Sequence, residues 1–212
     1  MSPRIAVLDY GIGNLRSAEK ALQHVGADAA LTTDPDEAAD ADGVVLPGVG
    51  AFGRCMEALR ASGHDSVATA AVERGVPLLA VCVGLQLLYD GSDESPGVAG
   101  LGVFPGTVAR LPEGVRRPQM QWNQLVVRPG AGRWLGGPDA GGPGPWVYFV
   151  HGYAAPDGPD VAATCDHGGP VVAALERGRV WATQFHPEKS GPAGLAILSA
   201  FAAEVATGAA VA

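Results

Sequence analysis

The sequence predicts an α/β fold with a mostly parallel sheet flanked by helices and extra antiparallel strands in its C-terminal half. Two observations support this prediction. Short apolar runs alternate with helix-like spacing up to about residue 90, which is typical of parallel sheets. After that point the pattern changes to shorter strand-like runs separated by turns. We expect a single domain covering residues 1–212, long enough to bury its own core.

Composition narrows the class of protein. The net charge of -8 argues against nucleic acid or an anionic membrane as the main partner. Three cysteines are an odd number, which argues against a disulfide framework and for a reducing compartment. We expect no membrane span, because Gly84 and Gln86 interrupt the longest apolar stretch, and no signal peptide, because the first run ends at Asp9. The expected location is the cytoplasm.

The first apolar run, 5–8, predicts a buried strand that leads through a loop into a helix. Asn14 can cap this helix. Four apolar residues then recur on one helical face: Leu15, Ala18, Leu22 and Val25. The Gly-Ile-Gly of 11–13 suggests a dinucleotide-binding loop, but Ser17 stands where the third glycine is most expected, so this interpretation has little support. Further strands are predicted at 29–32 and 44–46.

The stretch 76–90 organises the rest of the chain. It begins as a continuous apolar run, places Cys82 at its end and resumes helical spacing after Gly84. This order predicts a nucleophile elbow, a tight strand-to-helix turn that lifts one side chain above the sheet. A helix N-terminus beside Cys82 would favour the thiolate, the reactive form. On this stretch alone, an inert core cysteine remains the alternative.

The strand at 44–46 is followed by the loop 47–52, in which Gly48 and Gly50 surround Val49. Such a backbone can expose N–H groups at little steric cost. Acyl transfer needs these donors, because negative charge develops on the carbonyl oxygen that the nucleophile attacks. An ordinary tight turn is the alternative interpretation of this loop.

A second reactive pattern lies at His186-Pro187-Glu188. Proline keeps the preceding His186 extended, and side chains two apart on an extended chain share a face. Glu188 can therefore orient the imidazole, which can move a proton between Cys82 and a leaving amine. His151, at the end of a predicted strand, is an alternative base.

The C-terminal half contains several further predicted elements. The acidic segment 90–94 is expected to be a solvated loop, and 120–125 a strand with one wet face. Glycine and proline dominate 128–145, which predicts a flexible surface loop. Runs at 146–150, 171–175 and 180–182 predict strands, the last two forming a hairpin. Cys165-Asp166-His167 offers too few ligands for zinc, so we expect no metal and no cofactor.

These motifs together resemble the class I, or triad-type, glutamine amidotransferases, which have a flavodoxin-like fold. Within that family the chain most closely resembles the glutaminase subunits of imidazole glycerol phosphate synthase in histidine biosynthesis. The resemblance covers nearly the whole chain. The motifs that carry it are Asp9-Tyr10-Gly11 with Gly13-Asn14, the loop 47–52, 82–88, 97–101, Met120-Gln121-Trp122-Asn123, 148–153 and 184–190.

The resemblance implies a site and a reaction. Cys82 would form a glutamyl thioester, with His186 moving protons and Glu188 orienting it. The resemblance also implies substrate-binding and oxyanion positions at Gly48, Val49, Gly50, Gln86, Gly152 and Tyr153. Four residues depart from the familiar pattern, namely Ala80, Val83, Gln121 and Gly152; the last replaces a usual Ser or Thr, which leaves any hydroxyl contact to substrate open.

The resemblance also implies a partner. A separate cyclase subunit would receive the ammonia and form imidazole glycerol phosphate and aminoimidazole carboxamide ribotide, and an exposed Met120, Trp122 and Asn123 would contact it. The liganded partner would activate the glutaminase by favouring a flipped peptide at Val49. Alternatives are a glutaminase subunit of another ammonia-dependent enzyme, a stand-alone cysteine hydrolase, or a non-catalytic binding subunit.

Overall fold

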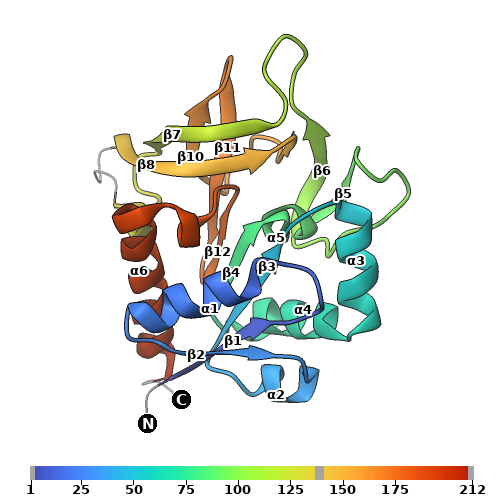
Figure 1. The fold of residues 1–212 in the computed structure, drawn as a ribbon, viewed down its shortest axis with the longest axis vertical. Helices are drawn as coiled ribbons and strands as arrows, with labels where there is room; N and C mark the ends of the chain where they lie inside the picture. Colours follow the sequence, from blue (N-terminus) through green and yellow to red (C-terminus); the bar gives the residue numbers. More distant parts are fainter. Residues whose placement is uncertain (1–2, 137–140, 210–212) are drawn as a thin grey trace.

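A nine-stranded sheet forms the centre of the molecule in a computed structural model that describes residues 3–136 and 141–209 (Figure 1). Five strands run parallel in the order β2-β1-β3-β4-β12. Their bounds are β1 Arg4–Leu8, β2 Asp28–Thr32, β3 Gly43–Gly48, β4 Leu78–Cys82 and β12 Val180–Thr183. These strands are rich in buried Val, Leu, Ile and Ala, as expected where helices flank a parallel sheet. The predicted α/β class is confirmed.

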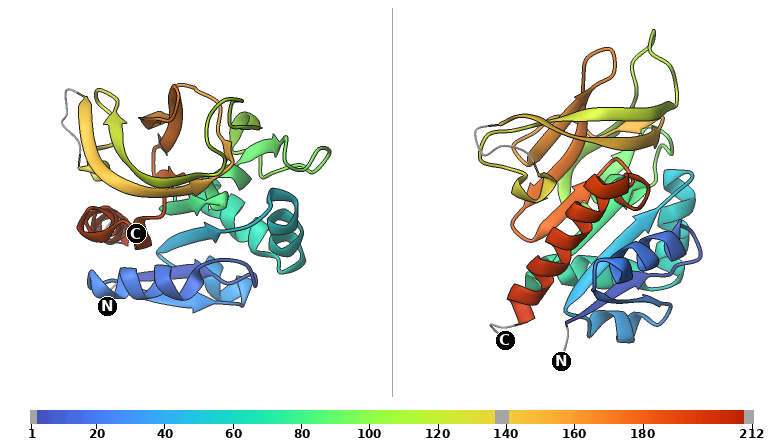
Figure 2. Two further views of the ribbon diagram at one scale, coloured as in Figure 1. Left: turned by 45° about the horizontal axis from the view of Figure 1, so that its top comes forward. Right: turned by 60° about the vertical axis from the view of Figure 1, so that its left-hand side comes forward.

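The sheet continues from β12 through four antiparallel strands in the order β11-β10-β7-β8. Their bounds are β7 Gln119–Val127, β8 Gly142–His151, β10 Val161–Asp166 and β11 Pro170–Arg177. A smaller sheet contains β5 Tyr89–Ser92, β6 Phe104–Arg110 and β9 Tyr153–Ala154. Figure 2 shows the β7–β8 ribbon curving over the end of the parallel half. The predicted 171–175/180–182 hairpin is present as β11–β12, and β12 also pairs with β4 inside the sheet.

The helices fall into two groups. Helix α1 (Leu15–His24) packs with α6 (Gly191–Ala209), while α2 (Pro35–Ala39) and α3 (Phe52–Ala61) pack with α4 (His64–Arg74). A short α5 (Val83–Leu87) follows β4, and the described residues also include the 3₁₀ turns η1 (Arg133–Leu135) and η2 (Pro187–Lys189). Contacts of α6 with η1, η2 and β8 connect the two halves of the chain.

The predicted flexible loop at 128–145 contains a buried anchor, so that prediction is wrong for its central residues. In η1 the Trp134 ring stacks on Trp181 of β12, with centroids 4.9 Å apart, and its Nε1 donates to Glu176 at 3.1 Å. Strand β8 also begins earlier than predicted, at Gly142. Residues 137–140 of the predicted loop lie outside the described residues.

The acidic segment 90–94 also makes more contacts with the rest of the protein than predicted. Its first three residues belong to β5, and Ser92 is buried. The Glu94 carboxylate accepts a hydrogen bond of 2.7 Å from the Phe52 backbone N–H at the start of α3. The prediction of a solvated loop is therefore wrong, because the segment pairs with β6 and braces α3.

Helix α6 was not considered as a possible membrane span in the sequence analysis. Its segment Gly191–Gly208 is long and apolar enough to cross a membrane by length and composition, and 28% of that window is buried. The face containing Ile197, Leu198, Phe201 and Val205 is buried in the core. Because this face packs against the rest of the protein, we assign α6 to the core of the fold.

Candidate active site

Cys82 ends β4 in an unusual backbone conformation. Its φ of 57° and ψ of -111° make it the only non-glycine residue with positive φ in the described part of the chain. Such strain concentrates at functional positions. The following α5 has five residues, so it is shorter than the helix predicted to follow, and Tyr89 already belongs to β5. The elbow geometry is present, with only a short helix behind it.

His186 and Glu188 lie together as predicted, although Glu188 belongs to the 3₁₀ turn η2 and not to an extended segment. His186 has extended φ and ψ angles of -99° and 100°, and Pro187 begins η2. The imidazole Nδ1 donates to Glu188 Oε1 at 2.8 Å, and both side chains are almost completely buried. Ser190 holds the segment in place by donating its hydroxyl to the His186 carbonyl at 2.6 Å.

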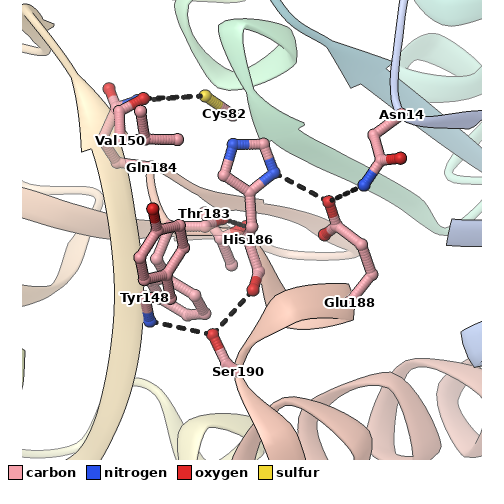
Figure 3. Close-up of polar contacts among 10 residues, drawn as sticks. Asn14, Cys82, Tyr148, Val150, Thr183, Gln184, His186, Glu188 and Ser190 are labelled. Carbon is pink, nitrogen blue, oxygen red and sulfur yellow. Dashed lines mark hydrogen bonds and ion pairs between the residues drawn. The ribbon is translucent and has the colours of Figure 1, made fainter. Parts of the chain in front are cut away.

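Figure 3 shows the imidazole between Cys82 and Glu188. Burial lowers the pKa of His186, but hydrogen bonds and charge interactions with Cys82 and Glu188 outweigh it and raise the pKa to about 9. For Glu188, burial raises the pKa, yet the interaction with His186 produces a net lowering. The arrangement therefore favours an imidazolium held between two groups that carry or can carry negative charge.

The sulfur itself has two further neighbours. Cys82 Sγ lies 3.9 Å from the Val150 carbonyl oxygen and 3.8 Å from Gln184 Nε2 (Figure 3). Gln184 Oε1 in turn accepts from Gln86 Nε2 at 3.1 Å, and Gln86 Nε2 also donates to the Tyr153 carbonyl at 3.2 Å. A buried amide chain thus runs from the sulfur to the β8–β9 turn.

Gln184 was missed by the sequence analysis. Gln184 precedes His186 by two residues, as His186 precedes Glu188, so the spacing argument that paired His186 with Glu188 could also have found Gln184. Glu94 was missed too, because the acidic segment was taken as solvated. The structure places Glu94 at the edge of the same pocket as Cys82.

A pocket of about 290 Å³ opens beside the sulfur. This volume is at the small end of ligand sites, which suits a molecule of amino-acid size. Its lining consists of Val49, Gly50, Cys82, Val83, Gln86, Glu94, Val150, His151, Gly152, Tyr153, His186 and Lys189. Of the predicted substrate and oxyanion residues, all except Gly48 line this pocket.

Gly48 has a different position. It pairs with Cys82 across β3 and β4, and a Cβ at Gly48 would lie 2.7 Å from the Gly84 nitrogen. Gly48 therefore lets β3 approach the elbow. The loop after it is held at two carbonyls: Tyr10 donates its hydroxyl to Pro47, and the Cys55 thiol donates to Val49 at 3.2 Å. These bonds fix the backbone on both sides of the Gly48–Val49 peptide.

His151 is poorly suited to act as a base. Its Nδ1 donates to the Tyr153 carbonyl at 2.8 Å, and burial lowers its pKa to about 4. The ring is therefore neutral near pH 7 and has little affinity for a second proton. The hydrogen bond from His151 to the Tyr153 carbonyl instead holds the turn at Gly152 in place.

The predicted partner contacts separate on the two faces of β7. Met120 and Trp122 are exposed, at 52% and 49%, and Trp122 packs edge-on against Tyr148. Asn123 faces the other way, and its side-chain amide donates to the Asp166 carbonyl at 2.7 Å. The alternative that this stretch is a core strand does not apply to Met120 and Trp122.

A second hollow, of about 800 Å³, lies between the ends of β6, β7 and β11. None of the proposed catalytic residues lines it.

Among the described residues, no group of three His, Cys, Asp or Glu side chains could hold a metal ion. Cys165 is buried, with Gln119 Nε2 3.5 Å from its sulfur, and His167 hydrogen-bonds the Arg116 carbonyl.

Comparison with known proteins identifies a family. The model of the class I glutamine amidotransferase family matches residues 6–205. The chain is 49% identical to the imidazole glycerol phosphate synthase subunit HisH of Synechococcus sp. strain JA-3-3Ab, over 96% of this chain and 94% of that protein. It is 46% identical to the HisH subunit of Methanothermobacter thermautotrophicus, over 93% of this chain and 96% of that protein. The HisH subunit of Deinococcus radiodurans is 44% identical, with coverage of 97% and 95%.

Solved structures agree on the fold. A crystal structure of a glutamine amidotransferase superposes with a TM-score of 0.73 at 23% identity, covering 96% of this chain and 98% of that one. The structure of PurLQS from Thermotoga maritima gives a TM-score of 0.72 at 21% identity, covering 95% and 98%. At these identities the likeness establishes the fold alone.

Proposed function

Because this chain belongs to the class I glutamine amidotransferase family, we propose that it hydrolyses L-glutamine at Cys82 as the glutaminase subunit of an imidazole glycerol phosphate synthase. The ammonia then serves histidine biosynthesis. The observation that carries the proposal is that Cys82 and His186 line one pocket of amino-acid size, with Glu188 bonded to His186 behind it. Relatives between 44% and 49% identical over nearly the whole chain support the choice of subfamily.

In the first half of the reaction, the Cys82 thiolate attacks the side-chain carbonyl carbon of glutamine. The C–N bond then breaks, the leaving nitrogen takes a proton from the His186 imidazolium, and ammonia departs from a glutamyl thioester. In the second half, His186 removes a proton from water, which attacks the thioester. The C–S bond breaks, glutamate leaves and the thiolate–imidazolium pair is restored. Glu188 holds Nδ1 throughout, so that Nε2 handles the proton.

The pocket supplies groups suited to the remaining parts of glutamine. Backbone N–H groups at Val49 and Gly50 are the proposed oxyanion donors, because both residues line the pocket beside Cys82. The Glu94 carboxylate is suited to the substrate's α-ammonium group. Gln86 and the backbone near Gly152 and Tyr153 are the proposed contacts for the rest of the amino-acid end.

The partner we propose is a separate cyclase subunit, which would receive ammonia through a closed passage and form a heterodimer with this chain. Met120 and Trp122 are the proposed contacts, since large exposed apolar side chains suit the core of an interface. Asn123 would contribute by fixing β7 through Asp166. We propose that the chain acts as one domain, in the cytoplasm, without nucleic acid or membrane partners.

We also propose that the liganded cyclase activates the glutaminase by favouring a rotated, or flipped, Gly48–Val49 peptide. The two held carbonyls, Pro47 and Val49, flank a Gly48–Val49 peptide that can rotate while its neighbours stay fixed. Equal glutaminase rates with and without the liganded partner would contradict this regulation. Activity in the absence of any partner would favour a stand-alone hydrolase.

The direct test uses a glutamine-mimicking electrophile, 6-diazo-5-oxonorleucine. It should label Cys82, which lines the pocket, and leave Cys55 and Cys165, which do not, unmodified in the full chain. Cys82→Ala should lose both labelling and glutamate release. If glutamate release persists in Cys82→Ala, the proposed nucleophile is wrong. Transfer of ammonia to a co-purified cyclase distinguishes the proposed enzyme from a glutaminase subunit of another ammonia-dependent enzyme.

A further inference from the structure

The loop before α1 contributes a side chain to the buried triad. Asn14 Nδ2 donates to Glu188 Oε1 at 3.2 Å, across 174 residues of sequence (Figure 3). The same oxygen accepts from His186 Nδ1, so one carboxylate oxygen receives two donors from opposite directions. The Asn14 bond is also one of the interactions that lower the Glu188 pKa, after the larger effects of burial and of His186.

Asn14 makes this contact in place of its usual one. It occupies the N-cap position of α1, where an asparagine side chain normally accepts from a backbone N–H and stabilises the helix. Here it makes no side-chain cap hydrogen bond. The amide is turned toward the carboxylate, and the helix begins without the stabilisation that this residue type could supply.

From these two observations we infer that Asn14 is a positioning residue of the triad, which holds Glu188 ionised and aimed at His186. This rests on the proposed function, in which His186 and Glu188 serve Cys82. Glu188 Oε1 accepts both bonds more strongly as a carboxylate oxygen than as the carbonyl oxygen of a neutral acid. A donor amide therefore favours the carboxylate form, in the orientation that fixes the imidazole tautomer.

The charged surroundings of this contact are simple. His186 is the ionisable group that contributes to the Glu188 pKa shift, and Cys82 acts on His186 in turn. On α1 the nearest charged side chain along the chain, Arg16, is 80% exposed and pairs with Glu19 at 3.7 Å. A new charge at position 14 should therefore act mainly on Glu188.

The test compares two variants, one that removes the donor at every pH and one that keeps a donor only while it is protonated. Asn14→Leu has no polar group, so we expect kcat for glutaminase to fall about tenfold, with KM changed less than twofold, as orientation of the proton carrier is lost. Asn14→Asp places a second carboxyl beside Glu188, and two such groups share one proton until the pH exceeds a raised pKa. While that proton remains, the protonated Asp can donate to Glu188 as the amide does.

The distinguishing readout is the ratio of variant to wild-type kcat across pH 5.5 to 9, measured on the full chain together with its co-purified partner. For Asn14→Leu the ratio should stay flat. For Asn14→Asp it should be near one at the acidic end and fall with rising pH. Arg16→Ala, at an exposed site on the same helix, is the matched control and should follow the wild type.

Parallel profiles for the two Asn14 variants, or wild-type kcat in Asn14→Leu, would overturn the inference. A thermal unfolding curve for each variant separates loss of fold from loss of positioning, and a poorly folded Asn14→Leu leaves the isosteric Asn14→Asp profile to decide. If Cys82→Ala retains full activity in the same assay, the proposed function fails, and the inference fails with it for that separate reason.

Discussion

Gly84 lies so close to Leu46 that a Cβ on Gly84 would stand 2.1 Å from the Leu46 carbonyl oxygen. Two backbone segments thus touch directly under the elbow, one after β4 and one within β3. No side chain separates them that could move aside. The position of Cys82 above the sheet therefore depends on the absence of a Cβ two residues later.

Gly84→Ala should destabilise the fold by more than about 3 kcal/mol, because either β3 or the elbow must shift to admit the methyl group. Urea unfolding measures this loss. Gly158→Ala is the control, since a Cβ there meets nothing within 4 Å, and it should change stability by less than about 0.5 kcal/mol. A Gly84→Ala variant as stable as the control would show that the close approach has no energetic importance.

The interactions of His186 with Cys82 and Glu188 should make stability depend on alkaline pH. The folded-state pKa of His186 is raised to about 9, above the roughly 6.5 of an unfolded histidine. The folded protein therefore binds more protons between these values, and this contribution to stability is fully present below about pH 6.5 and lost as the pH rises through 9. Unfolding free energies measured from pH 6 to 10 should decline over this window.

Glu188→Gln removes the carboxylate that stabilises the imidazolium, so the alkaline decline should become shallower. Its kcat should fall about 100-fold or more, because the amide can hold the wrong tautomer, as with the equivalent change in serine proteases. Identical alkaline slopes for the wild type and Glu188→Gln would contradict the assigned cause. Arg16→Ala again provides the unaffected control.

Gln184→Leu should slow the chemistry more than it weakens the fold. The change removes the amide that approaches the Cys82 sulfur and leaves Gln86 with only the Tyr153 carbonyl as partner. We expect labelling of Cys82 by the diazo electrophile to slow at least fivefold, with about 1–3 kcal/mol of stability lost through the unpaired amide. Gln23→Leu also removes a hydrogen-bonded amide, but on α1, and should not change labelling. Equal labelling rates in both variants would refute a role for Gln184 at the sulfur.

Trp122→Ala should weaken binding of the proposed cyclase subunit at least tenfold, since a half-exposed tryptophan is the kind of side chain that dominates interfaces. Asn123→Ala, on the opposite face of β7, should weaken it much less. Titration of the partner by calorimetry measures both. A larger loss in Asn123→Ala than in Trp122→Ala would place the interface on the other face.

Local sequence patterns predicted the parallel half of the fold well, because its inner strands β1, β3, β4 and β12 are buried on both faces and have mostly apolar sequences. They failed where tertiary contacts overrode composition. Trp134 anchors a glycine-rich segment by stacking on Trp181. The Glu94 carboxylate accepts a hydrogen bond at the start of α3, where a solvent-exposed side chain was predicted. Neither contact has a local signal, since each joins segments about 40 residues or more apart.

Sequence alone was sufficient to single out Cys82, His186 and Glu188 as candidates, because each stands in a short local pattern: a strand ending in a thiol, and a His-Pro-Glu in which proline keeps the histidine extended. Tertiary structure decided what surrounds them. It turned Asn14 from its helix cap to the Glu188 carboxylate and brought Gln184 beside the sulfur. It also assigned Gly48 to packing rather than to the pocket. Hydrogen bonds between distant segments depend on how the whole chain folds, and the residue type at one position does not determine that arrangement.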